Sequence, residues 1–198
     1  MATTKKVKAK KQGATAVIAK SVTPIPTVTS PPISTSRVEY IESIRPILAE
    51  LERYLVWVAE GGHAFEIPLS GKVVVTIQTH GARKNELGHF LHDCWADKEG
   101  QAVHEINITA EALSRDPYEI LEVLHHEAIH LYNHRHQVKD CSTSGRHNLK
   151  FRDAALERGM DFDRDENGNF IPPGSKGYAL PKATPELLAA QRDLFAPD

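Results

Sequence analysis

A capped helix that carries three histidines on one face is the strongest structural restriction in this sequence. Asp116-Pro117-Tyr118-Glu119 supplies a capping carboxylate, a proline in the first turn and a glutamate at the third helical position, so we predict that a helix begins there. On a helical wheel, the histidines at 126, 130 and 134 share one side and the apolar residues share the other. The helix, which we expect to end near His134, therefore packs its apolar face on a sheet and turns its histidines away from the core.

The same helix contains the motif HExxH, formed by His126, Glu127 and His130. Residues four apart lie about 40° apart on a helix, so both imidazoles point the same way and can hold one Zn²⁺. Glu127 flanks that position, where it can take a proton from the attacking water. We interpret the pair as metal ligands rather than solvated histidines of an exposed face. His125 falls on the apolar side, and we predict a packing role for it.

A catalytic zinc site needs a third protein ligand, and the spacing leaves three candidates open. His136 gives HExxHxxNxxH, a metzincin-like spacing with Asn133 in the usual glycine position, but the surroundings of Met160 do not resemble that family's methionine turn. His134 continues the helix face, yet one straight helix does not readily wrap three ligands around an ion. His147 follows a loop over 137–146, where an antiparallel return of the chain brings it back over the pair. Geometry favours His147 or His136 over His134.

The remaining pattern predicts an α+β fold with a small antiparallel or mixed sheet. Helical spacing over 38–59 predicts a first helix, with Pro46 kinking it or separating its first turn. Further elements are expected as strands over 72–79, 88–95 and 102–108, a second ligand-bearing helix over 148–158, a hairpin over 161–171 turning at Asn167-Gly168, and a helix from Thr184 to about Leu194.

Composition divides the chain into a tail, one domain and a C-terminal segment. Residues 1–36 contain six lysines and no acidic residue among Thr, Ser and Pro, so we predict a disordered basic tail that either aids solubility or contacts DNA or RNA phosphates. The domain is expected over 37–180, and a C-terminal helix or tail over 181–198. The net charge of −2 gives no overall attraction to nucleic acid, and no apolar run is long enough to span a membrane. We expect a cytoplasmic monomer.

Two weaker signals have simpler interpretations. Asp163-x-Asp165-x-Asn167-Gly168 resembles the start of a calcium loop, but its twelfth position is Gly174, so we favour the hairpin. The two cysteines, Cys94 and Cys141, cannot build a disulfide framework, and we interpret both as inert thiols. The alternative for Cys141 is an inhibitory fourth metal ligand.

The segment Gly145-Arg146-His147-Asn148-Leu149-Lys150-Phe151 resembles the second motif of SprT-like (Spartan-type) metalloproteases. In that family, the third histidine is followed four residues later by an aromatic residue, as HGxxF or HNxxF. The resemblance covers about residues 40–180 and implies a zincin-like fold in which His126, His130 and His147 bind Zn²⁺ and Glu127 is the base. Phe151 is expected to pack the second helix on the first. The chain departs from many relatives in lacking a C-terminal four-cysteine zinc ribbon, and Asn148 replaces the commoner glycine, as in WLM-type domains.

The resemblance implies a zinc-dependent metallopeptidase that acts on proteins or peptides. Some relatives cleave proteins crosslinked to DNA, and here the Lys-rich tail would supply the DNA contact. The alternatives are a non-catalytic zinc-containing module that binds DNA or protein, an ImmA-like peptidase with an acidic third ligand, and a metzincin-like peptidase. We expect the strand that ends near Ile108 to be an edge strand that aligns the substrate. The candidates for stabilising the oxyanion are His134, Tyr132, Arg135 and Tyr178.

Overall fold

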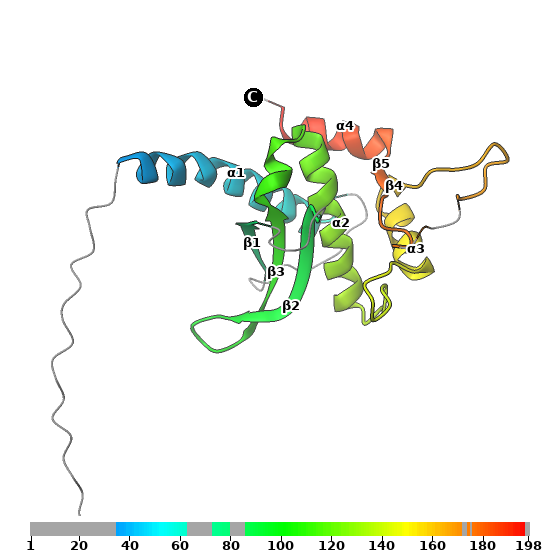
Figure 1. The fold of residues 1–198 in the computed structure, drawn as a ribbon, viewed down its shortest axis with the longest axis horizontal. Coiled ribbons are helices and arrows are strands. Elements are labelled where there is room, and N and C mark those ends of the chain that lie inside the picture. Colours follow the sequence, from blue (N-terminus) through cyan, green and yellow to red (C-terminus); the bar gives the residue numbers. More distant parts are fainter. Residues whose placement is uncertain (1–34, 63–72, 80–85, 172–173, 175, 197–198) are drawn as a thin grey trace, which may run out of the picture. The chain divides into compact units, whose positions relative to one another are not determined.

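The computed structural model describes residues 35–62, 73–79, 86–171, 174 and 176–196, with side chains from residue 44 onward. Within these residues the fold is α+β, with four α-helices, a three-stranded sheet and a two-stranded ladder (Figure 1). The predicted basic tail lies outside the described residues except for its last two positions, which begin the first helix. None of the helices in the described ranges combines the length and apolar character needed to cross a membrane.

The first helix, α1 (Thr35–Ala59), confirms the helical spacing of the sequence. It is continuous through Pro46, so the expected separation of its first turn is wrong. Tyr54 and Val58 lie in the core, and Gly61 follows the helix with a φ of 98°, which glycine adopts at little cost.

The sheet consists of β1 (Val73–Gln78), β2 (Gly88–Ala96) and β3 (Ala102–Thr109), and all three strands were predicted. Their order is β1-β3-β2, with β1 parallel and β2 antiparallel to β3. The strand that ends near Ile108 is therefore the central strand, and its prediction as an edge strand is wrong. The chain crosses over between β1 and β2, and no local residue pattern reveals such a crossover.

Strand β2 contains a bulge. Its pairing with β3 moves from Leu91 opposite Glu105 to Trp95 opposite Val103, which leaves His92, Asp93 and Cys94 opposite His104 alone. Asp93 has a φ of 53°, in the left-handed region that aspartate adopts more readily than most residues. Bulges of this kind bend a strand and redirect its side chains.

The predicted histidine helix is α2 (Pro117–Arg135), joined to β3 by the short 3₁₀ helix η2 (Ala110–Ser114). The predicted cap is confirmed: the Asp116 carboxylate accepts the backbone N–H of Tyr118 at 2.9 Å. The apolar residues of α2 join one hydrophobic core with residues of α1, β3 and the later helices, and its members include Leu55, Ile106, Ile108, Leu124, Ala128, Leu131, Phe151 and Leu187.

His125 packs inside this core, as predicted, and is completely buried. Its Nδ1 lies 2.7 Å from the Tyr54 hydroxyl, and its Nε2 lies 2.7 Å from the carbonyl oxygen of Arg158. The carbonyl can only accept, so Nε2 carries the proton and Nδ1 accepts from tyrosine. Gln191 in turn donates to the same hydroxyl at 2.8 Å. This buried polar chain links α1, α2 and the two following helices.

The C-terminal part contains α3 (Leu149–Glu157), β4 (Met160–Asp161), β5 (Lys182–Ala183) and α4 (Pro185–Leu194). The predicted hairpin over 161–171 is confirmed as a short antiparallel turn, in which the N–H of Ile171 donates to the carbonyl of Asp163 at 3.0 Å, while β4 at its start pairs with β5. A single bridge between Arg164 and Phe170 surrounds the expected turn, where Asp165 accepts the backbone N–H groups of Asn167 and Asn169, both at 2.9 Å. This carboxylate therefore stabilises the turn. Helix α4 belongs to the same compact unit as the rest of the domain.

Candidate metal centre

Three imidazole rings converge where α2 meets the start of α3. The Nε2 atoms of His126 and His147 lie 3.0 Å apart, those of His130 and His147 3.0 Å, and those of His126 and His130 3.2 Å. A tetrahedral zinc ion with Zn–N bonds of 2.0–2.1 Å separates its ligand nitrogens by about 3.3–3.4 Å. The triangle is close to one face of that tetrahedron, so this donor set fits a zinc ion with small adjustments.

Phe151 packs against all three rings of the histidine triad formed by His126, His130 and His147. Its ring is completely buried, and its centroid lies 4.6, 4.7 and 4.5 Å from those of His126, His130 and His147. The expected packing of α3 on α2 through Phe151 is confirmed. Because the ring touches all three imidazoles, it restricts their rotation and keeps their nitrogens aimed at a common point.

Asp140 orients His130, and the sequence reasoning missed it. Its Oδ2 lies 2.7 Å from Nδ1 of His130 and accepts from the Asn133 amide at 3.0 Å. Nδ1 then carries the ring proton and Nε2 is left with a lone pair for a metal. Burial opposes ionisation of Asp140, but these hydrogen bonds and the charge of His130 hold its pKa below the usual value. The sequence did offer one signal for this role, because Asp140 is a carboxylate that lies between the HExxH motif and His147.

Asn148 connects Asp140 to α3. Its side-chain oxygen caps the helix by accepting from the backbone of Lys150 and Phe151, while its amide donates to the carbonyl of Lys139 at 2.9 Å. Its backbone N–H donates to the carbonyl of Asp140, also at 2.9 Å. Asparagine in the position where the resembling family more often has glycine therefore has a structural role here, because it fixes the segment that carries Asp140.

We predict that Asp140→Ala weakens zinc binding about 10–100-fold, because His130 loses the partner that fixes its tautomer and direction. Competition with a chromogenic chelator measures the change. Asp153→Ala is the matched control, since Asp153 is an exposed carboxylate on α3 that pairs with its neighbour Arg152. Equal zinc affinity of the two variants would contradict this role of Asp140.

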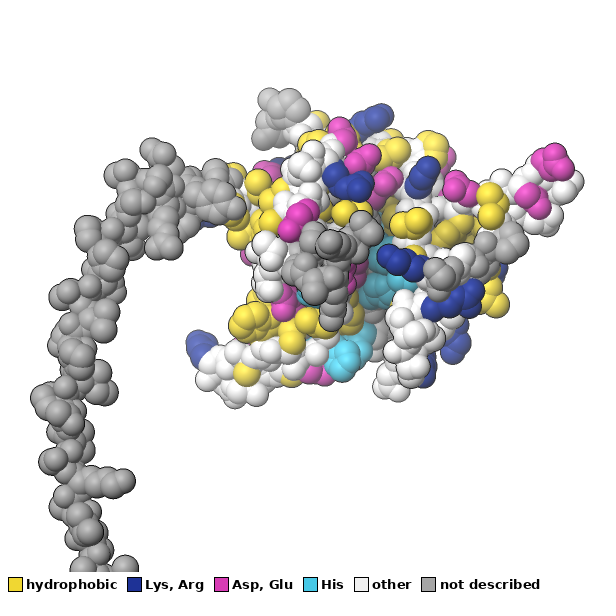
Figure 2. Space-filling model, in the orientation of Figure 1, with side chains coloured by type: hydrophobic (Ala, Val, Ile, Leu, Met, Phe, Trp, Pro, Cys, Tyr) yellow, Lys and Arg dark blue, Asp and Glu magenta, His cyan; other side chains and the backbone are white. Residues whose placement is uncertain are grey.

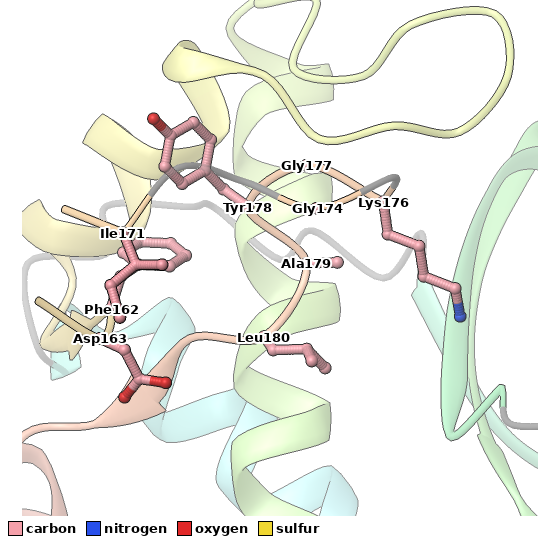
Figure 3. A pocket seen from close by; sticks show the side chains of 9 residues that line it. All are labelled: Phe162, Asp163, Ile171, Gly174, Lys176, Gly177, Tyr178, Ala179 and Leu180. Atoms are coloured by element: carbon pink, nitrogen blue, oxygen red, sulfur yellow. The ribbon is translucent and has the colours of Figure 1, made fainter.

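A second segment fixes His147 from the other side. The backbone N–H of His147 donates to Lys176 at 3.1 Å, and its carbonyl accepts from Tyr178 at 3.3 Å. Gly177 lies so close that a Cβ there would be 2.0 Å from the carbonyl oxygen of His147, and its φ of 68° also favours glycine. In Figure 3, Tyr178 and Lys176 leave this segment in opposite directions. The one sequence signal for this contact was Gly177, because glycine permits such a close approach of two backbone segments, but the sequence reasoning gave it no role.

Glu127 lies beside the triad and is buried, with 6% of its surface exposed. The backbone N–H of Phe90 on β2 hydrogen bonds its carboxylate. Strand β2 approaches closely here because Gly88 has no side chain: a Cβ would lie 2.7 Å from Val123 and 2.8 Å from the carbonyl of Asn107. Burial raises the pKa of Glu127 to about 7, while the charge of His130 opposes the rise. A divalent cation nearby would act in the same direction as His130 and lower the pKa of Glu127.

The three imidazoles of the triad differ in the direction of their pKa shifts. Burial and the neighbouring charge of His130 lower the pKa of His147 to about 4 and hold that of His126 well below its usual value. Burial also acts to lower the pKa of His130, but the hydrogen bond that His130 donates to Asp140 and the charges of Glu127 and Asp140 raise it overall. Two of the three imidazoles are therefore neutral near pH 7, as metal ligands must be.

The triad and Glu127 open on a cleft of about 910 Å³. Residues 86–92, including part of β2, form one wall, and residues of α2, the 138–147 loop and the 176–182 segment form the others. Figure 2 shows histidine side chains in and beside a hollow on this face. Because β2 is an edge strand of the described sheet, the cleft has a strand rather than a helix along one side.

The structure separates the other predicted candidates from the triad. His136 is exposed at the end of α2, where its ring stacks on Tyr132 with centroids 4.0 Å apart. The metzincin-like spacing is therefore wrong as a ligand set. His134 lies apart from the triad and stacks on His92. Asp140 faces Nδ1 of His130 rather than the Nε2 triangle, so it does not replace His147 as the acidic third ligand of an ImmA-like site.

Of the four oxyanion candidates, His134 lines the cleft. Arg135 and Tyr132 are not among the described residues that line it, and the guanidinium of Arg158 lies 3.5 Å from the Tyr132 ring centroid. Tyr178 is not among the described residues that line the cleft, and it packs on Phe162 with ring centroids 5.5 Å apart.

Cys141 lines the cleft beside His130 and Asp140. Burial, followed by the charge of Asp140, raises the pKa of its thiol to about 12. The side chain is therefore a protonated thiol near neutral pH, which is a poor metal ligand compared with a thiolate.

Comparisons of this chain with protein-family models, with curated proteins and with solved structures found no match. The resemblance to SprT-like metalloproteases therefore stays a prediction that depends on the two histidine motifs.

Proposed function

We propose that this chain is a zinc-dependent metallopeptidase with a zincin-like, SprT-like catalytic domain. One observation carries the proposal: three Nε2 atoms lie 3.0–3.2 Å from one another beside a buried glutamate, at the wall of an open cleft. A purely structural zinc site is usually closed by four protein ligands and needs no adjacent base. The open cleft and Glu127 therefore favour an enzyme over a binding module.

The bound ion would supply a Lewis acid that activates water and polarises the substrate carbonyl. His126, His130 and His147 would hold it through their Nε2 atoms, and Asp140 keeps the lone pair of His130 directed at it. Glu127 takes a proton from the attacking water and delivers it to the leaving amine of the cleaved bond. Glu127 lines the cleft, and the hydrogen bond from the backbone of Phe90 favours its ionised form.

The substrate that this cleft suits is an extended segment of polypeptide. Strand β2 borders the cleft and is an edge strand of the described sheet, so its backbone can pair with an extended chain. A folded protein does not present such a segment, whereas an unfolded one does. Proteins associated with DNA are a further proposed substrate class, with the DNA contact made by the Lys-rich tail outside the described residues.

The full-length protein, assayed on unfolded casein with and without DNA, tests this function. We expect about one zinc ion per chain by elemental analysis, cleavage that a chelator abolishes, and recovery when Zn²⁺ is added back. Stimulation by DNA would extend the proposal to DNA-associated proteins, and its absence would restrict the substrate to protein alone. A zinc-loaded chain that leaves casein intact under both conditions would contradict the proposed activity.

A further inference from the structure

A second group of metal-ligating side chains lies one turn further along α2, and two of its three members line the same cleft. His92 and Asp93 come from the β2 bulge and His134 from α2, and one ligand atom from each lies within 4.8 Å of the others. We propose that these three residues form a second, weaker divalent-cation site that takes Zn²⁺ and, when filled, obstructs the substrate path along β2. The site stands on its own geometry, while its effect on substrate rests on the proposed function.

The bulge is what brings the two β2 residues to one place. In a regular strand, successive side chains point to opposite faces, so His92 and Asp93 would lie on different sides of the sheet. The shift of register between Leu91 and Trp95 and the left-handed φ of 53° at Asp93 break that alternation. His92 then stacks on His134, and Asp93 reaches both the His92 ring and the same helix.

Buried neighbours hold the ring of His134 and the backbone of Asp93 in position. The backbone N–H of Asp93 donates to Nδ1 of His104 at 3.1 Å, and His104 is 6% exposed. The His134 ring lies against His104 and Phe90, with centroid distances of 5.1 and 5.7 Å. His92, whose side chain is 64% exposed, is the most exposed member of the group. The ring of His134 is therefore fixed by packing, whereas the ring of His92 has room to turn.

The donor set of two imidazoles and one carboxylate suits zinc, which accepts nitrogen and oxygen ligands. The rings of His92 and His134 are stacked, with planes 14° apart, so their in-plane lone pairs do not yet meet. His92 must turn for all three atoms to bind one ion, and two exposed side chains then lose rotational freedom. Arg135 also places positive charge near His134. We therefore expect binding about 100-fold weaker than at the triad.

The position of the second site determines its effect. The ligand atoms of His92, Asp93 and His134 form a group separate from the Nε2 triangle, and the two groups have no residue in common. An ion held there would not take part in the reaction. His92 and His134 both line the cleft, so the ion would instead fill space along β2 that an extended substrate needs.

Zinc titration of the metal-free full chain by calorimetry tests the site directly. We expect one tight and one weak class of sites, and we expect His92→Ala and Asp93→Asn to remove the weak class while the tight class persists. Asn tolerates the left-handed φ of Asp93, so that variant keeps the bulge. His136→Ala, which removes an exposed histidine from the same helix, should leave both classes unchanged. A single class in the parent chain, or a weak class that survives in both variants, would overturn the proposal.

Two further measurements separate this proposal from the proposed function. His147→Ala should lose the tight class and keep the weak one, and this result is independent of any catalytic activity. In the casein assay, excess Zn²⁺ should inhibit the parent chain, and His92→Ala should need roughly tenfold more Zn²⁺ for the same inhibition. Equal inhibition of both chains would refute the obstruction of the substrate path.

Discussion

The variant Glu127→Gln is expected to bind zinc as the parent chain does and to lose at least about 1,000-fold in casein cleavage. Glutamine has nearly the same shape as glutamate, so the buried site keeps its packing and the Nε2 triangle is unaffected. The amide cannot accept a proton from water, however, so the proposed base is lost. Elemental analysis and the initial rate of casein cleavage, measured on the same preparation, check both halves of this result.

The matched control is Glu119→Gln, which changes another glutamate of α2 that lines the same cleft. Glu119 is exposed and pairs with Arg115, so its loss should leave cleavage within about twofold of the parent. If Glu127→Gln and the parent chain cleaved casein equally, the observed proteolysis would come from a contaminant or from another site.

The variant His147→Ala is expected to lose most of its zinc on dialysis and, with it, all cleavage. Two ligands from one helix remain, and a two-ligand site cannot complete the tetrahedral coordination that zinc prefers in proteins. His147 is half-buried at the start of α3, and Phe151 stays in the core, so the fold should survive. Zinc content after dialysis and the far-UV circular dichroism spectrum together distinguish loss of metal from unfolding.

His136→Ala is the control for this second variant, because it removes a histidine from the end of α2 without touching the triad. It should retain zinc fully. Zinc retained by His147→Ala but lost by His136→Ala would return the ligand set to the metzincin-like spacing, in conflict with the ring positions described above.

Features that depend on local residue patterns were predictable from the sequence. Asp116 caps α2 as expected. A capping side chain bonds backbone groups in the first turn of its own helix, so the local sequence is enough to predict it. Strand β1 follows from a β-branched run bounded by Gly71 and Gly81, and β3 from an alternation of residues along 102–108. The convergence of His126 and His130 follows from helical periodicity alone, whereas His147 joins them through the loop that reverses the chain.

Features that depend on distant parts of the chain were not predictable in the same way. The central position of β3 results from a crossover, and the pairing of β4 with β5 joins residues separated by about twenty positions. The partnership of Asp140 with His130 needs a loop conformation that Asn148 fixes. The close approach of Gly177 to His147 belongs to a segment for which the sequence offered no periodic pattern.

The buried polar chain through His125 has a consequence for the metal centre. His125 precedes His126 directly, and its ring is clamped between the Tyr54 hydroxyl and the carbonyl of Arg158 at the end of α3. Gln191 of α4 donates a hydrogen bond to the same Tyr54 hydroxyl. Helix α2, which carries His126 and His130, and helix α3, which follows His147, are thus held by contacts with α4, which contributes no ligand. Removal of α4 would consequently loosen the packing that keeps the three imidazoles in position, although α4 lies outside the metal centre.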